Sequence, residues 1–178
     1  MINEQELLNF IEPYYAGKDI MHDLWHIRLV DKTVDKIIQQ GSYAVDREVL
    51  KLAVAFHGFI YQDEPAIRSW LIRKEIPLER IDKIIQVAWE SQRPEIPESL
   101  EGKILHDAHV LEGGKTYLVV KTLITGSLRG QSLMQTLDFM RDHCLGANKC
   151  YLPETIPLCE EMNRFAEHFY RNLINELP

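Results

Sequence analysis

Three short segments hold the histidines and carboxylates of this chain whose spacing suits a metal ion. They read HDLWH at residues 22–26, AFHG at 55–58 and LHDAH at 105–109. Imidazole nitrogens and carboxylate oxygens bind zinc, iron, manganese and similar divalent ions. A site built from one such group in each segment would keep coordination positions open. An ion with open positions activates water, so the pattern indicates hydrolytic chemistry.

The first segment places His22 and His26 four residues apart, which puts them on one face of a helix. Such a pair either chelates one ion, or one histidine faces a site while the other packs near the helix start. Asp23 suits the capping position of that helix, or it orients a histidine from outside the ligand set. The segment also resembles a zinc-peptidase motif with aspartate for glutamate, but Asp23 is too short to reach the water on such an ion.

The second and third segments each place polar groups in apolar surroundings. His57 closes an apolar helical run and is either a satisfied core residue or a ligand. Gly58 after it costs about 1 kcal/mol relative to alanine in a helix, which indicates a close approach of other atoms or a lost functional side chain. Asp107 requires a buried partner. Because His109 points nearly opposite Asp107 and His106 a quarter-turn away, we expect Asp107 as the ligand and both histidines as neighbours or surface groups.

Apolar residues recur at helical spacing almost throughout the chain, and no stretch alternates with a period of two. We therefore predict an all-α protein, a helical bundle of about nine helices in a single domain over residues 1–178. Glycine pairs and prolines separate the helices. The expected helices span Glu4–Glu12, Asp23–Gln40, Asp46–Ile60, Pro65–Lys74, Leu78–Ser91, Leu100–Glu112, Thr116–Thr125, Ser132–Cys144 and Pro153–Glu176.

The composition excludes several classes of protein. Hydrophobic residues make up 46 % of the chain and charged residues 26 %, which is typical of a globular protein. A net charge of −7 argues against extended nucleic-acid binding and against an anionic membrane surface, because both require a positive field. No apolar stretch reaches the ~20 residues of a membrane span, and the N-terminal segment lacks the features of a signal peptide. Three cysteines without a CxxC pair favour reduced thiols in a cytoplasmic protein.

In their order, the three segments resemble the HD-domain superfamily of metal-dependent phosphohydrolases, whose pattern is H…HD…D. The resemblance implies an all-helical fold with His26, His57 and Asp107 as the metal ligands. It is stronger to a bacterial branch that has HDxxH near the start and a later ILxDADxLxxxG segment. Further similarity at residues 130–146 and 161–170 extends the resemblance over about residues 20 to 175.

The chain departs from that family pattern at four positions around one site. Gly58 replaces the aspartate of the HD doublet, which binds metal in the family, and His109 replaces the second aspartate of DAD. Glu90 stands where the branch has a histidine near the phosphate, and Leu29 stands where it has an arginine. The loss of one anionic ligand predicts weaker metal binding. Glu90 is the best candidate to supply the missing charge, ahead of the acidic pair at 63–64, which suits a helix start.

The resemblance implies a divergent phosphohydrolase that acts on a phosphorylated small molecule or nucleotide with a weakly held divalent ion (Zn, Mn, Fe, Ni or Mg). We expect catalytic roles for Glu90 and Asp23, and substrate contacts from His22, Arg93 and Lys103. The alternative is a catalytically inactive HD-like protein that binds a ligand or a protein partner in the former pocket, with Glu90 on a solvated face. A third interpretation is a helical structural protein with dispersed histidines.

Overall fold

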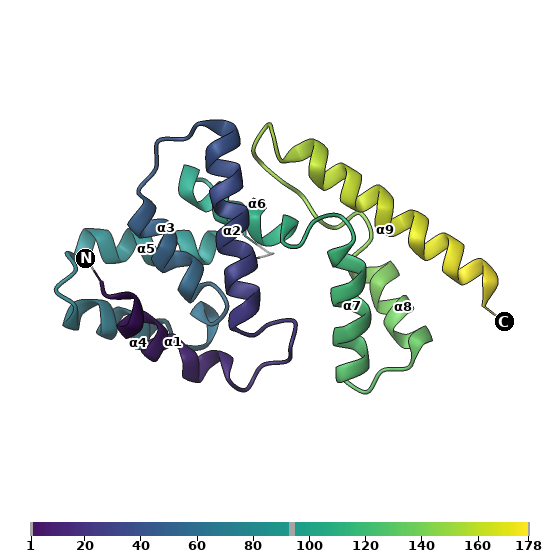
Figure 1. Cartoon of the computed structure of the whole chain (residues 1–178), viewed down its shortest axis with the longest axis horizontal. Coiled ribbons are helices and arrows are strands. Elements are labelled where there is room, and N and C mark those ends of the chain that lie inside the picture. Colours follow the sequence, from purple (N-terminus) through teal and green to yellow (C-terminus); the bar gives the residue numbers. More distant parts are fainter. Residues whose placement is uncertain (1, 93–94, 178) are drawn as a thin grey trace. The chain divides into compact units, whose positions relative to one another are not determined.

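The computed structural model describes residues 2–92 and 95–177, which form helices and contain no strand (Figure 1). The all-α prediction and the number of helices are confirmed for these residues. In chain order the helices are α1 (Glu4–Tyr15), α2 (Leu24–Gly41), α3 (Arg47–Phe56), α4 (Ile60–Arg73), α5 (Leu78–Glu90), α6 (Leu100–Leu111), α7 (Tyr117–Leu128), α8 (Leu133–His143) and α9 (Ile156–Glu176).

The first histidine segment lies at the start of α2. Asp23 precedes this helix in an extended conformation, and its carboxylate accepts a hydrogen bond from the Trp25 amide at 2.8 Å. This contact satisfies one of the amides that a helix start leaves without a partner inside the helix. Asp23 therefore has the capping position that the sequence suggests for it.

The second segment lies at a break that the sequence does not predict. α3 ends at Phe56, so His57 follows the helix, and the chain turns before α4 begins at Ile60. α4 contains a kink at Asp63, whose backbone angles (φ −151°, ψ 58°) are not helical. The kink comes two residues before Pro65, which cannot donate a helical hydrogen bond. The helix predicted to begin at Pro65 is thus the second part of α4.

The contacts of the chain group into two compact units, Met1–His109 and Val110–Pro178. The boundary falls within α6 rather than in a linker. The expectation of one domain over residues 1–178 stays a prediction. All three histidine segments lie in the first unit.

Helix α3 forms the centre of the first unit. Seven of its ten residues are buried, and its charged residues lie in its first half. It packs against α5, α2 and α1, and α5 also packs against α4. The rings of Phe10, Phe56, Phe59 and Trp70 contact one another beside it. This packing fixes the C-terminal end of α3, where His57 begins the turn.

The second unit has its own apolar core. α7 packs against α8 and α9, and the buried residues Val119, Met140, Cys144 and Ala166 form one cluster between them. The three cysteines of the chain are free thiols, two of them buried, as expected for packing residues.

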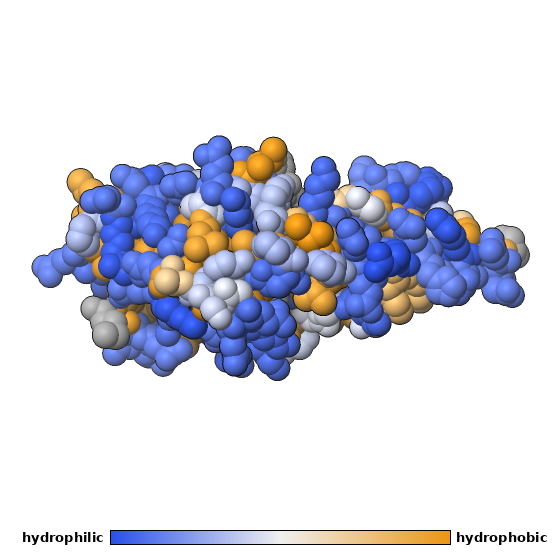
Figure 2. Space-filling view, turned by 90° about the horizontal axis from the view of Figure 1, so that it is seen from above, coloured by the Kyte–Doolittle hydropathy of each residue, from blue (hydrophilic) through white to orange (hydrophobic). Residues whose placement is uncertain are grey.

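Hydrophilic residues predominate on the face of the molecule in Figure 2, with smaller hydrophobic patches between them. This surface agrees with the charged fraction of the chain, which is 26 %. Within the part of the chain that the structure describes, every helix is too short or too polar to cross a lipid bilayer.

Tyr15, at the end of α1, fills the space beside Gly58. Its hydroxyl donates to the Ala55 carbonyl at 3.0 Å and accepts from the Gly58 amide at 3.2 Å. Burial raises the pKa of this hydroxyl far above its ordinary value, so it stays protonated as a donor. A Cβ atom on Gly58 would lie 2.5 Å from the hydroxyl oxygen. A close approach of other atoms therefore explains the glycine.

Gly58→Ala should lower the free energy of unfolding by about 1–3 kcal/mol, because the added methyl group overpacks the contact with Tyr15. Gly17→Ala is the matched control, since no atom lies within 4 Å of a Cβ at that position. Urea denaturation of both variants measures the difference. Equal stability of the two variants would contradict the tight contact.

Candidate metal centre

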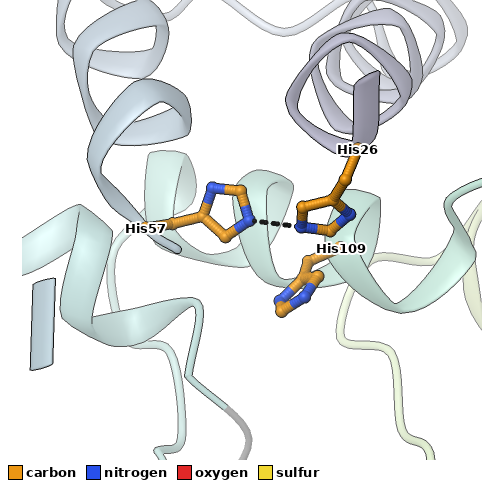
Figure 3. Close-up of side chains that lie close together, drawn as sticks. All are labelled: His26, His57 and His109. Carbon is orange, nitrogen blue, oxygen red and sulfur yellow. Dashed lines mark hydrogen bonds between the residues drawn. The ribbon is translucent and has the colours of Figure 1, made fainter. Parts of the chain in front are cut away.

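Three imidazole rings converge in the first unit, and they come from three different helical segments. His26 lies in the first turn of α2, His57 directly follows α3, and His109 lies near the end of α6. One nitrogen from each ring lies within 4.8 Å of the other two. Figure 3 shows the rings facing a common centre. His26 and His57 are 3 % and 1 % exposed, and His109 is half-buried.

Backbone carbonyls fix the orientation of two of these rings. The Nδ1 atom of His57 lies 2.6 Å from the Val54 carbonyl oxygen, and that of His109 lies 3.3 Å from the Ser91 carbonyl oxygen. A carbonyl oxygen only accepts, so each Nδ1 atom carries the proton. In the neutral ring Nε2 then keeps its lone pair, which is the arrangement of histidine ligands in metal sites.

The spacing of the His26 and His57 nitrogens suits ligation of one ion. The Nε2 atoms of His26 and His57 lie 3.1 Å apart. Two nitrogen ligands at ~2.0–2.1 Å from one zinc ion lie ~3.0–3.4 Å from each other, depending on the coordination angle. Imidazole donors suit zinc, iron, copper and nickel, whereas magnesium and manganese prefer oxygen. The group therefore fits a transition metal such as zinc or iron better than the magnesium or manganese of the expected set.

The third member of the group is His109, which the sequence analysis placed among the neighbours or surface groups, and the structure corrects this. The expected role of Asp107 as a metal ligand stays a prediction. The two side chains lie nearly opposite on α6. Asp107 is fully buried, with its carboxylate 3.3 Å from Nδ1 of His106. The sequence held one signal for His109, which is that a histidine stands where the DAD pattern has its second aspartate. The rotation of α6 about its axis, which sets the direction of each side chain, is not visible in the sequence.

His22 lies beside this group and outside it. Its Nδ1 atom lies 2.8 and 3.0 Å from the two carboxylate oxygens of Asp19, and its ring centre is 6.1 Å from that of His26. This arrangement matches the second interpretation of the HDLWH segment, in which one histidine faces the site and the other packs near the helix start. The expected catalytic role of Asp23 stays a prediction, since the contact seen for its carboxylate is the helix cap.

Glu90 is buried rather than solvated, with 8 % of its surface exposed, so the surface interpretation is wrong. Its carboxylate accepts hydrogen bonds from Gln86 at 2.9 Å and from the Ser99 hydroxyl. Ser99 immediately precedes α6, and a side chain at Gly102 in the first turn would collide with the Glu90 carboxylate. Glu90 thus anchors the start of α6, and its expected catalytic role stays a prediction.

The three residues 90–92 at the end of α5 connect the segments that carry the histidines. Glu90 binds the start of α6, and the carbonyl of Ser91 accepts from His109. The side-chain amide of Gln92 donates to the His57 carbonyl at 2.8 Å. This tripeptide therefore sets the positions of two of the three imidazole rings.

Of the remaining charged candidates, those that the structure describes are not part of the histidine group. Lys103 is half-buried on α6, six residues and about 240° before His109. Arg93 lies outside the described residues. Their expected phosphate contacts stay predictions. Asp63 accepts from a backbone amide at the kink in α4, and Glu64 accepts from Arg68 and Trp89, which agrees with the structural roles suggested for this pair.

Comparisons with known proteins give the fold. Neither a family model nor a curated protein sequence matches the chain. Over 99 % of its length the chain is similar to the crystal structure of Lin1889 from Listeria innocua, with 23 % identity, a TM-score of 0.71 and 100 % of that chain covered. It is also similar to Bacillus subtilis YpgQ in complex with ADP, with 17 % identity, a TM-score of 0.74 and coverages of 99 % and 98 %. At these identities the similarity establishes a shared helical fold.

His26→Ala, His57→Ala and His109→Ala should each weaken zinc binding by about 100-fold or more, because loss of an outer partner alone costs about 10–100-fold. His143→Ala removes an exposed histidine of α8 and should leave the Kd for zinc unchanged. Competition with a chromophoric chelator measures the Kd. Asp107→Asn separates the two ligand sets: weak binding in this variant, with normal binding in His109→Ala, would restore Asp107 as the ligand.

Glu90→Ala should lower the free energy of unfolding by about 1–3 kcal/mol, because it leaves partly buried donors at the start of α6, among them the Ser99 hydroxyl, without their acceptor. Glu79→Ala, at an exposed position of the same helix, should change stability by much less. Urea denaturation measures both. Unchanged stability in Glu90→Ala would contradict the anchoring role and favour direct participation in chemistry.

Proposed function

We propose that this protein is an HD-type, metal-dependent phosphohydrolase that acts on a nucleotide or a similar phosphorylated small molecule. The observation that carries the proposal is the convergence of His26, His57 and His109 from separate helical segments on one centre. Two of these residues are the histidines that the HD resemblance designates as ligands. The ordered motifs over most of the chain support the same class.

The ligand class has a second source of support. Bacillus subtilis YpgQ, which shares the fold over 98 % of its own length, has been solved in complex with ADP. The three imidazoles are neutral ligands, so they leave the positive charge of a bound ion uncompensated. Such a site attracts anions, and the oxygen atoms of phosphate groups are good ligands for a metal ion.

The chain's own residues would prepare this chemistry in two ways. A divalent ion held by the three histidines lowers the pKa of a coordinated water and polarises a phosphoryl oxygen. The carbonyls of Val54 and Ser91 prevent ring rotation, so the ligand nitrogens keep one geometry. Asp19 likewise orients the ring of His22, for which the sequence suggests a substrate contact.

One observation favours the alternative of an inactive, ligand-binding descendant. The space in which an aspartate at position 58 would stand is filled by the Tyr15 hydroxyl. An aspartate at position 58 would require the Tyr15 hydroxyl to move. An inactive protein would keep the ligand pocket without turnover.

Purified protein should release phosphate from nucleotides or phosphomonoesters only in the presence of a transition metal. Treatment with a chelator should abolish the activity, and zinc, iron or nickel should restore it. His57→Asn should remove the activity without unfolding the protein, whereas His143→Asn should not change it. We would measure phosphate and nucleotide products by chromatography.

Protein that binds zinc and ADP but turns over no phosphomonoester, nucleotide or cyclic dinucleotide with any of these ions would contradict the hydrolase proposal. That result would establish the ligand-binding alternative. Protein that binds neither zinc nor any phosphorylated ligand would contradict both.

A further inference from the structure

Lys18, in the loop between α1 and α2, reaches the backbone next to the histidine group. Its ammonium donates a hydrogen bond to the carbonyl of Gly58, which directly follows His57. It also lies over the ring of Tyr15, 4.9 Å from the ring centre, and 5.9 Å from the ring centre of Tyr61. The sequence gives no signal for this contact, because 40 residues separate Lys18 from its acceptor.

The positive charge of Lys18 is not neutralised by these contacts. A carbonyl dipole and the faces of two aromatic rings stabilise an ammonium group but carry no net charge. Within residues 2–92 and 95–177, no carboxylate forms an ion pair with it. The adjacent Asp19 directs its carboxylate to His22 and to the Met21 amide. Burial lowers the pKa of Lys18 by more than the nearby charge of Asp19 raises it, which reflects the cost of holding an ammonium there.

The loop that carries Lys18 lies beside two of the three imidazoles. Near its start, Lys18 is tied to the residue after His57. Near its end, the ring centre of His22 is 6.1 Å from that of His26. Lys18 and His22, near the two ends of this loop, thus lie next to the residues that carry two of the three imidazoles, at Gly58 and at His26.

We propose that Lys18 binds the phosphate oxygens of the ligand that occupies the His26–His57–His109 group. The inference rests on the proposed function for the ligand class, a nucleoside diphosphate or a similar phosphate ester. A lysine ammonium is a common point-charge partner of phosphate, and partial burial strengthens its attraction for an anion. Lys18 thereby takes the phosphate-binding role that the sequence analysis assigned to Arg93 and Lys103.

The test is ADP binding, measured by isothermal titration calorimetry with zinc-loaded protein. Lys18→Met should weaken ADP binding by about tenfold or more, the size of one charge-assisted hydrogen bond. Lys36→Met removes an exposed lysine of α2 and should leave the Kd within about twofold of that of the wild type. Lys18→Arg keeps the charge and should recover part of the affinity. Inorganic phosphate as a second probe should show the same ranking.

Thermal unfolding of each variant separates binding from folding. A lower Tm for Lys18→Met with unchanged affinity for ADP would assign Lys18 a structural role and overturn the proposal. Absence of ADP and phosphate binding in the wild type would overturn it as well. The binding assay needs no turnover, so weakened binding in Lys18→Met together with absent hydrolysis would uphold Lys18 while rejecting the hydrolase function.

Discussion

The structure of the first unit depends on one constraint, which is that buried imidazole rings need partners for both of their nitrogens. His57 and His109 meet this requirement on one side with the backbone carbonyls of Val54 and Ser91. Their remaining nitrogens then face one another and His26 across a short distance. The Nε2 atoms of His26 and His57, 3.1 Å apart, are satisfied either by a hydrogen bond from a neutral His26 ring protonated at Nε2, or by a metal ion held by the lone pairs of both rings. The packing of the surrounding helices therefore brings these nitrogens to a distance that suits a hydrogen bond or the ligation of one ion.

The features that could be predicted from the sequence are those that depend on residues close together in the chain, such as helices and their caps. Helical periodicity is a property of neighbouring residues, so the all-α class and the cap at Asp23 followed from it directly. His26 and His57 also emerged, because their segments resemble the HD pattern. The choice between Asp107 and His109 depends on the rotation of α6, which Glu90 and Ser99 help to fix from outside that helix. Lys18 was missed because its acceptor lies 40 residues away. Contacts of this kind leave no periodic signal in a single sequence.

Position 58, where the HD pattern has an aspartate, is a glycine in this chain. The Tyr15 hydroxyl lies where a side chain at this position would begin, and the Lys18 ammonium donates to the Gly58 carbonyl. The three members of the histidine group are neutral ligands. Such a group would retain a single ion less firmly than one that includes a carboxylate ligand, and with an ammonium nearby it would attract anionic ligands more strongly.

The tripeptide at 90–92 makes the length of α5 a determinant of the metal centre. Its three consecutive residues contact the start of α6, the ring of His109 and the carbonyl of His57. One residue inserted into or deleted from α5 would turn all three by about 100° around the helix axis. No change of side chain at a single position could repair that rotation. Related sequences that keep this geometry should therefore tolerate substitutions along α5 far more readily than insertions.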